Sequence, residues 1–252
     1  MPGKYLRYLS SRERAPGADL SLARYLTFVA GAANAGGFLA VNVYTSHMSG
    51  LVASMADNLA LMKLDIVLLC IGTLTAFLSG SACTAVLVNW AKRRSLESLY
   101  ALPLILESIL LVLFGLLGQN LSINSGKSVS ITVGTLAFLM GLQNALITKI
   151  SKAEIRTTHV TGMITDIGIE LGKLFYWNDS ARRQSGEVVL ANREKLKILS
   201  SLVSLFFIGG IVGALGFKFV GFAFSLPLAL LLCVIGVLPA VDDLRHRTGN
   251  SR

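Results

Sequence analysis

Six apolar stretches, each close to 20 residues long, limit most strongly how this chain folds. They are residues 25–43, 66–90, 100–118, 129–148, 198–220 and 222–241. Because an α-helix needs about 20 residues to cross the hydrocarbon core of a bilayer, each stretch has the length of one crossing. Helices cross lipid because they satisfy their own backbone hydrogen bonds. The pattern therefore predicts an all-α polytopic membrane protein with about six transmembrane helices.

The composition agrees with a membrane location. Apolar residues make up 53% of the 252 residues and charged residues 15%, whereas a soluble domain carries roughly a quarter charged residues. Mean hydropathy is +0.65. The first 24 residues are basic and polar and hold no apolar run of the kind that a cleavable signal peptide needs. The three cysteines lie within the predicted spans without metal or redox spacing, so they are interpreted as packing residues.

The net charge of +9 is distributed along the chain in a regular way. Basic residues gather before the first span, after the second, between the fourth and fifth, and after the last. The intervening loops carry few, which is the positive-inside pattern. This pattern predicts a multi-pass protein of the cell inner membrane with both termini in the cytoplasm. Contacts with anionic lipid are a further role for these cations, and no nucleic-acid role is expected.

The chain contains an internal repeat. "FVAGAANA" at 28–35 and "FLMGLQNA" at 138–145 both read F-x-x-G-x-x-N-A, and "AFLSGS" at 76–81 more weakly resembles "FFIGGI" at 206–211. Gly31 and Gly141, the glycines of the first two motifs, are expected to permit close helix packing. Each half holds three spans, and because three is odd, the second half must start from the opposite side of the membrane. Inverted repeats of this kind are common in secondary transporters.

The repeat predicts how the chain is divided. Residues 1–24 form a cytoplasmic N-terminal segment and 25–118 the first three-helix repeat. Residues 119–241 form the second repeat, with a cytoplasmic linker at 178–197, and 242–252 form a cytoplasmic tail.

Two similar polar heptads follow the repeated motifs: "YTSHMSG" at 44–50 and "RTTHVTG" at 156–162. Their hydroxyl residues suit helix N-caps; these are Thr45, Ser46, Thr157 and Thr158. Gly50 and Gly162 permit a close approach or an unusual backbone angle. Each heptad is predicted to break a membrane helix and to precede a short helix that is either re-entrant or lies along the membrane surface.

His47 and His159 occupy the same place in the two heptads. Imidazole gains or loses a proton near neutral pH, so a matched pair is suited to relaying protons or holding an anion. The alternative is that each histidine caps a helix or bonds a neighbouring carbonyl group.

One pair of asparagines and two further polar side chains lie inside predicted spans. Asn34 and Asn144 stand at equivalent positions, with Gln143 beside the second, and they either line a solute path or bond helix to helix. Glu107 is the one carboxylate well within a predicted span. Intramembrane acids are costly and therefore are candidates for a functional role, although a water-facing position is the alternative.

Several chemistries have no signature in this sequence. It contains no phosphate-binding GxxxxGK[ST], no HExxH, no GxSxG and no paired carboxylates in a catalytic relation. No enzyme activity, cofactor or metal site is expected from it.

The combination of motifs resembles a known family. "FVAGAANAGGF" followed by "TSHMSG", and "GLQNA" followed by "TTHVTG", are similar to phrases of the YoaK-like family of uncharacterised bacterial multi-pass membrane proteins. The resemblance is close over about 30–165 and implies an integral inner-membrane protein of about six spans. It implies no particular function.

Together these features predict a transporter or channel for a small solute, anionic or coupled to protons, with its path between the two halves. The expected partners are the lipid bilayer and that solute; a homo-oligomer is left open. One alternative is a membrane scaffold or subunit in which the heptads are structural helix breaks. Another is an intramembrane enzyme acting on lipids.

Overall fold

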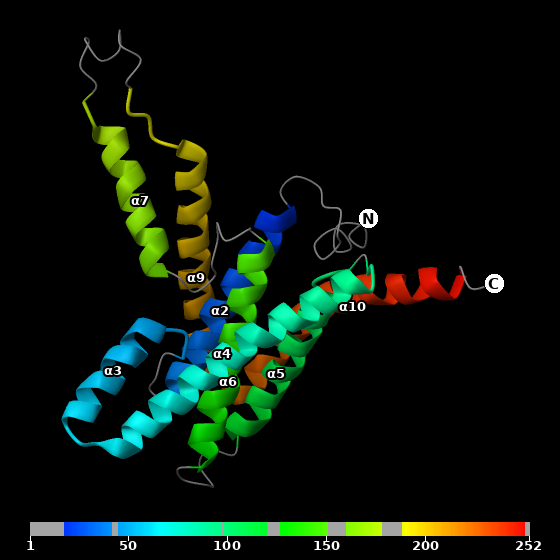
Figure 1. The fold of residues 1–252 in the computed structure, drawn as a ribbon, viewed down its shortest axis with the longest axis horizontal. Coiled ribbons are helices and arrows are strands. Elements are labelled where there is room, and N and C mark those ends of the chain that lie inside the picture. Colours follow the sequence, from blue (N-terminus) through cyan, green and yellow to red (C-terminus); the bar gives the residue numbers. More distant parts are fainter. Residues whose placement is uncertain are drawn as a thin grey trace.

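Helices form nearly all of the structure, which is a computed structural model that describes residues 18–41, 45–96, 98–119, 127–150, 160–177 and 188–249. The described residues contain no strand, which confirms the all-α prediction. In chain order the elements are α2 (Ala18–Val41), α3 (Met48–Ala60), α4 (Leu64–Arg93), α5 (Ala101–Gln119), α6 (Lys127–Ile150), α7 (Val160–Phe175), α9 (Arg193–Val220), the 3-10 helix η1 (Gly221–Phe224) and α10 (Ser225–Gly249) (Figure 1).

Four stretches are long and apolar enough to cross a membrane, and they indicate a membrane-embedded protein. They are Leu64–Arg93, Ala101–Gln119, Ser128–Ile150 and Arg193–Val241, the last of which contains α9, η1 and most of α10. Helix α2 is not among them, because its charged and polar residues, such as Arg24 and Asn34, and its glycines lower its hydropathy. Six spans therefore remain a prediction.

Helix α9 begins before the residue that the sequence suggests and ends at the expected one, Val220. Helix α9 starts at Arg193, so the last five residues of the expected linker at 178–197 are helical. The side chain of Asn192 caps this helix by accepting a hydrogen bond from the backbone N–H of Lys195 at 2.9 Å. At its other end α9 runs to Val220, and the chain turns at Gly221, whose φ of 72° favours glycine.

Helices α2 and α9 pack backbone against backbone. A Cβ atom on Gly31 would overlap the carbonyl oxygen of Phe206, and one on Gly209 would overlap that of Phe28. The absence of side chains at these glycines lets the two helices approach closely, as small residues do in membrane helix pairs. The contact joins a helix of the first half of the chain to one of the second.

Helices α4 and α6 repeat this arrangement. A Cβ atom on Gly141 would overlap the carbonyl oxygen of Phe77, and one on Gly80 would overlap that of Phe138. The hydroxyl of Ser81 donates across the pair to the carbonyl oxygen of Gly141 at 3.0 Å. In both helix pairs, two F-x-x-G segments therefore meet, each glycine opposite a phenylalanine carbonyl.

Helices α5 and α10 form the third close pair, beside η1. The buried ring of Phe114 lies edge-on to the rings of Phe217 and Phe222, with ring centroids 5.9 and 5.8 Å apart. Aromatic pairs in this geometry add to the burial of their surface. The cluster fixes the α9–η1–α10 turn against α5.

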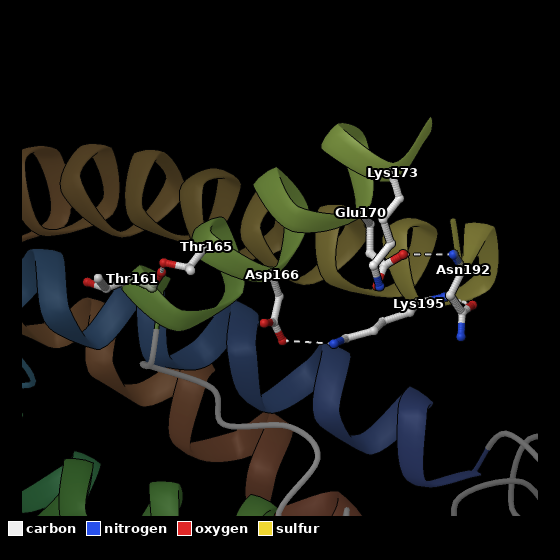
Figure 2. A network of polar contacts seen from close by, with 7 residues as sticks. All are labelled: Thr161, Thr165, Asp166, Glu170, Lys173, Asn192 and Lys195. Atoms are coloured by element: carbon white, nitrogen blue, oxygen red, sulfur yellow. Dashed lines mark hydrogen bonds and ion pairs between the residues drawn. The ribbon is translucent and has the colours of Figure 1, made fainter. Parts of the chain in front are cut away.

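Helix α7 is fastened to α9 by charged groups (Figure 2). One carboxylate oxygen of Glu170 accepts a hydrogen bond from the backbone N–H of Asn192 at 2.7 Å, and the other accepts from Lys173 at 2.9 Å. Asp166 forms an ion pair with Lys195 at 3.1 Å. The hydrogen bonds from Lys173 and from the Asn192 backbone hold the pKa of Glu170 below its ordinary value.

We expect the docking of α7 on α9 to weaken in acid. Because the pKa of Glu170 is lower in the folded state than the ordinary value of about 4.3, the stability that Glu170 contributes is present above that value. It is lost as the pH falls through the lower, folded-state pKa. Hydrogen-exchange protection of α7, corrected for the intrinsic exchange rate, should therefore fall as the pH is lowered below the ordinary glutamate pKa of about 4.3.

The variant Glu170→Gln is the matched control, since it keeps the shape of the side chain and does not titrate. It should show weaker protection of α7 at neutral pH and a flatter response to acid. An equally steep acid response in the variant would mean that another group controls the docking.

Candidate functional site

The first heptad ends in a helix start that differs from the expected one. Helix α3 begins at Met48, and its N-cap is His47, whose side chain makes no capping hydrogen bond. Ser46 and Thr45, the expected caps, lie one and two residues before it. Neither is the N-cap, because the helix starts at Met48; the hydroxyl of Ser46 donates instead to Asn34 Oδ1 at 3.0 Å, and the hydroxyl of Thr45 is buried without a hydrogen-bond partner among the described residues.

Gly50 serves a close approach and not an unusual backbone angle. Among the described residues Gly221 is the one glycine with positive φ. A Cβ atom on Gly50 would lie 2.6 Å from Nδ1 of His47, so the imidazole folds back over the first turn of α3. Residues three apart on a helix are neighbours, which explains why a glycine follows the histidine by three positions. Gly162 has the same place in the first turn of α7.

A polar cavity of about 830 Å³ opens at this heptad. It lies between α4, α6 and the first turns of α3 and α7, and it brings together three of the predicted path residues, Ser46, His47 and Asn144. Its lining is Ser46, His47, Met48, Ser49, Phe77, Ser81, Ala85, Asn144, Ala145, Thr148, Lys149 and Thr161.

The electrostatics of this cavity favour an anion. Lys149 lines it and forms no salt bridge with any residue that the structure describes. No carboxylate belongs to its described lining. The first turns of two helices, α3 through Ser49 and α7 through Thr161, border it. Helix N-termini carry unpaired N–H groups and a partial positive charge.

A second cavity of about 650 Å³ lies between α2, α7 and α9. Asn34, another predicted path residue, lines it, and the remaining lining is almost entirely apolar. The lining is Gly31, Asn34, Ala35, Phe38, Leu39, Val160, Ile164, Val203, Phe206, Phe207, Gly210, Ile211 and Ala214.

Glu107 and Gln143 lie apart from both cavities, since neither belongs to a described lining. Both are fully buried. The Gln143 side-chain amide donates to Glu107 Oε1 at 2.6 Å and to the carbonyl oxygen of Leu26 at 3.1 Å. One amide therefore ties α6 to α5 and to α2, and the arrangement is that of an internal crosslink.

The remaining predicted residues separate into two groups. Gly31 and Gly141 lie at the backbone contacts of the helix pairs. His159, Thr157 and Thr158 lie outside the described residues.

Sequence reasoning missed five polar residues of the polar cavity: Ser49, Ser81, Thr148, Lys149 and Thr161. Thr148 follows Asn144 by four positions on α6 and therefore lies on the helix face of a residue already singled out, which was the available signal for it. Lys149 follows Asn144 by five positions, about 140° further around the helix, so the same spacing rule does not indicate it. Ser81 belongs to a different predicted span, and the sequence did not indicate that this span would lie beside Asn144.

The fold and cavities define a helical membrane-embedded protein with two cavities between its helices. The chain belongs to the family described as "Protein of unknown function (DUF1275)", whose model matches residues 22–238. This confirms the uncharacterised membrane-protein family expected from the repeated phrases. No curated protein and no solved structure matches the chain.

Proposed function

We propose that this protein carries a small anionic solute, of the carboxylate class, across the membrane at the interface of two inverted three-helix repeats. The observation that carries the proposal is the polar cavity, in which Lys149, His47 and the first turns of α3 and α7 meet without a carboxylate in the described lining. The solute is bound and released unchanged, with no chemical step.

The helix contacts support the inverted repeat. In the α2–α9 pair, Gly31 lies opposite Phe206 and Gly209 opposite Phe28; in the α6–α4 pair, Gly141 lies opposite Phe77 and Gly80 opposite Phe138. Exchanging the two halves of the chain turns one set of contacts into the other. Reciprocal contacts of this kind are expected from a two-fold axis between the halves.

The cavities and hairpins support the same symmetry. Phe77, Ser81 and Ala85 of the polar cavity have the spacing of Phe206, Gly210 and Ala214 in the apolar one, and the asparagines of the two F-x-x-G-x-x-N-A motifs each line one cavity. In Figure 1 the α7–α9 hairpin lies at the upper left of the view and the α3–α4 hairpin at the lower left. An inverted repeat would place the two hairpins on opposite sides of the membrane.

The geometry of the polar cavity supports a carboxylate. A lysine ammonium, helix N–H groups and an imidazole are donors that a carboxylate accepts. The hydroxyls of Ser46 and Ser49 and the amide of Asn144 supply further polar groups. In this proposal His47 binds the solute or accepts a coupling proton, and Asn34 and Asn144 line the route.

The proposed setting is the cell inner membrane with both termini in the cytoplasm. It rests on the basic residues that flank alternate hydrophobic stretches. The lipid bilayer is then the one constant partner.

We expect Lys149→Gln to weaken the binding of small carboxylates about 10- to 100-fold, because a hydrogen bond to a charged group contributes about 1.5–3 kcal/mol. Dissociation constants for acetate, butanoate and succinate would be measured by thermal-shift titration of the purified protein, with uptake measured in proteoliposomes. Lys92→Gln is the matched control, because Lys92 is an exposed lysine on α4 outside both cavity linings.

The results separate the proposal from its main alternative. Binding that weakens in Lys149→Gln and persists in Lys92→Gln, together with uptake, supports a carrier. Binding of no carboxylate by a stable wild type contradicts the proposal and favours a scaffold in which the heptads are helix breaks.

A further inference from the structure

The linings of the polar and apolar cavities are joined by one hydrogen bond. Ser46 lines the polar cavity and donates to Asn34, which lines the apolar cavity, at 3.0 Å. On α7, Thr161 lines the polar cavity and the preceding residue, Val160, lines the apolar one. The partition between the two spaces is therefore the Ser46–Asn34 pair and the first turn of α7.

Positions with the same spacing in the two cavities carry opposite chemistry. From the asparagine of each repeated motif, the fourth and fifth following residues are Thr148 and Lys149 in the polar cavity, and Phe38 and Leu39 in the apolar one. The asparagine itself is kept on both sides. One space is therefore suited to a charged group, and the neighbouring space to hydrocarbon.

We infer that the solute is an amphiphilic anion, with its carboxylate head in the polar cavity and its hydrocarbon chain in the apolar cavity. The inference rests on the proposed function and specifies its substrate class. Lys149 supplies the charge complementary to the head, and Phe38, Leu39 and Phe207 supply apolar contacts for the chain. The chain enters the apolar cavity beside or through the Ser46–Asn34 pair, whose single hydrogen bond between uncharged groups is easily exchanged.

The test is a chain-length series of straight-chain carboxylates on the full protein in lipid nanodiscs: acetate, butanoate, hexanoate and octanoate, with octanol as the uncharged probe. Empty nanodiscs correct for partition into lipid. The dissociation constant should fall about fourfold for each CH₂ group that becomes buried. Octanol should bind more weakly than octanoate, because it lacks the charge that Lys149 complements.

Gly210→Leu tests where the chain lies. Gly210 lines the apolar cavity, and a Cβ atom there would meet only the carbonyl oxygen of Gly31, at an ordinary 3.9 Å, so a larger side chain fills the cavity and not the helix contact. The variant should bind acetate as wild type does and lose the gain with chain length. Gly72→Leu is the control, since nothing lies within 4 Å of a Cβ atom at that glycine of α4, which lines neither cavity.

Each other result overturns the inference in a distinct way. Equal binding of all four carboxylates is consistent with the carrier proposal but shows that a hydrocarbon chain does not contribute to binding. A chain-length gain that persists in Gly210→Leu places the chain elsewhere. Octanol that binds as tightly as octanoate would show that the carboxylate does not contribute, and the apolar cavity would then be a groove for the hydrocarbon chains of bilayer lipids. Failure of acetate and all longer acids to bind contradicts the proposed function itself.

Discussion

Replacing Gly141 with alanine should lower the stability of the protein by about 1–3 kcal/mol, the usual cost of overfilling a packed contact. The added Cβ would overlap the carbonyl oxygen of Phe77 and lie 2.8 Å from its carbonyl carbon and 3.0 Å from its Cα. These are backbone atoms of α4, so no side-chain rotation relieves the overlap and the two helices must separate. The expected result is a fall of several degrees in the apparent melting temperature in detergent.

The same helix provides the matched control. Nothing lies within 4 Å of a Cβ atom placed on Gly134 of α6, so Gly134→Ala adds the same atom in open space. It should leave the melting temperature unchanged or raise it, because alanine favours a helix over glycine. Gly31→Ala, at the reciprocal contact with Phe206, should lose about as much as Gly141→Ala. A Gly141→Ala protein as stable as Gly134→Ala would refute the close contact of α4 and α6.

Local patterns in the sequence predicted the helices and part of their packing. Runs of apolar residues indicate a membrane helix without any knowledge of its neighbours, and a small residue recurring in a repeated motif indicates a contact, as at Gly31 and Gly141. The sequence did not define which glycines of α4 and α9 lie at the contacts with α6 and α2. The similarity of "AFLSGS" and "FFIGGI" aligns Gly80 with Gly210. In the structure the equivalent of Gly80 is Gly209, because each of these two glycines lies against the phenylalanine carbonyl of a repeated motif. A register one residue away changes which face of a helix meets its neighbour.

The candidate site was less predictable because it is assembled from four helices. Ser46, His47 and Asn144 were found through the repeat, but Lys149 has no counterpart that the repeat could reveal, since the equivalent residue is Leu39. Comparing the two repeats identifies residues that both halves share and does not identify positions at which the halves differ. In this protein the differences determine the chemistry of the two cavities.

Glu107 illustrates a further limit of the sequence, because an isolated polar residue in a predicted span suggests a role in the solute path, and that role stays a prediction. The structure buries Glu107 fully and hydrogen-bonds it to Gln143, away from both described cavity linings. A carboxyl group inside a predicted span is as compatible with a crosslink between helices as with a path. The choice depends on tertiary neighbours that the sequence does not give.

Replacing Gln143 with leucine should therefore destabilise the protein by about 2–4 kcal/mol. The change removes the donor of two hydrogen bonds, to Glu107 Oε1 and to the carbonyl oxygen of Leu26. Glu107 Oε1 is then buried without a donor, which costs about 1–3 kcal/mol, whereas the Leu26 carbonyl oxygen keeps its intrahelical N–H donor inside α2, so loss of the second bond adds about 0.5–1.5 kcal/mol. The free energy of unfolding would be measured by titration with a denaturing detergent.

The double variant Glu107→Leu/Gln143→Leu distinguishes a crosslink from a path. Because both polar partners are then replaced by apolar groups of similar size, much of the lost stability should return, with a coupling energy of about 0.5–3 kcal/mol in the double-mutant cycle. Carboxylate uptake by this variant should also persist, since neither residue lines a described cavity. A stable double variant that binds carboxylate but no longer transports it would return Glu107 to the solute path, because only a role in transport separates those two measurements.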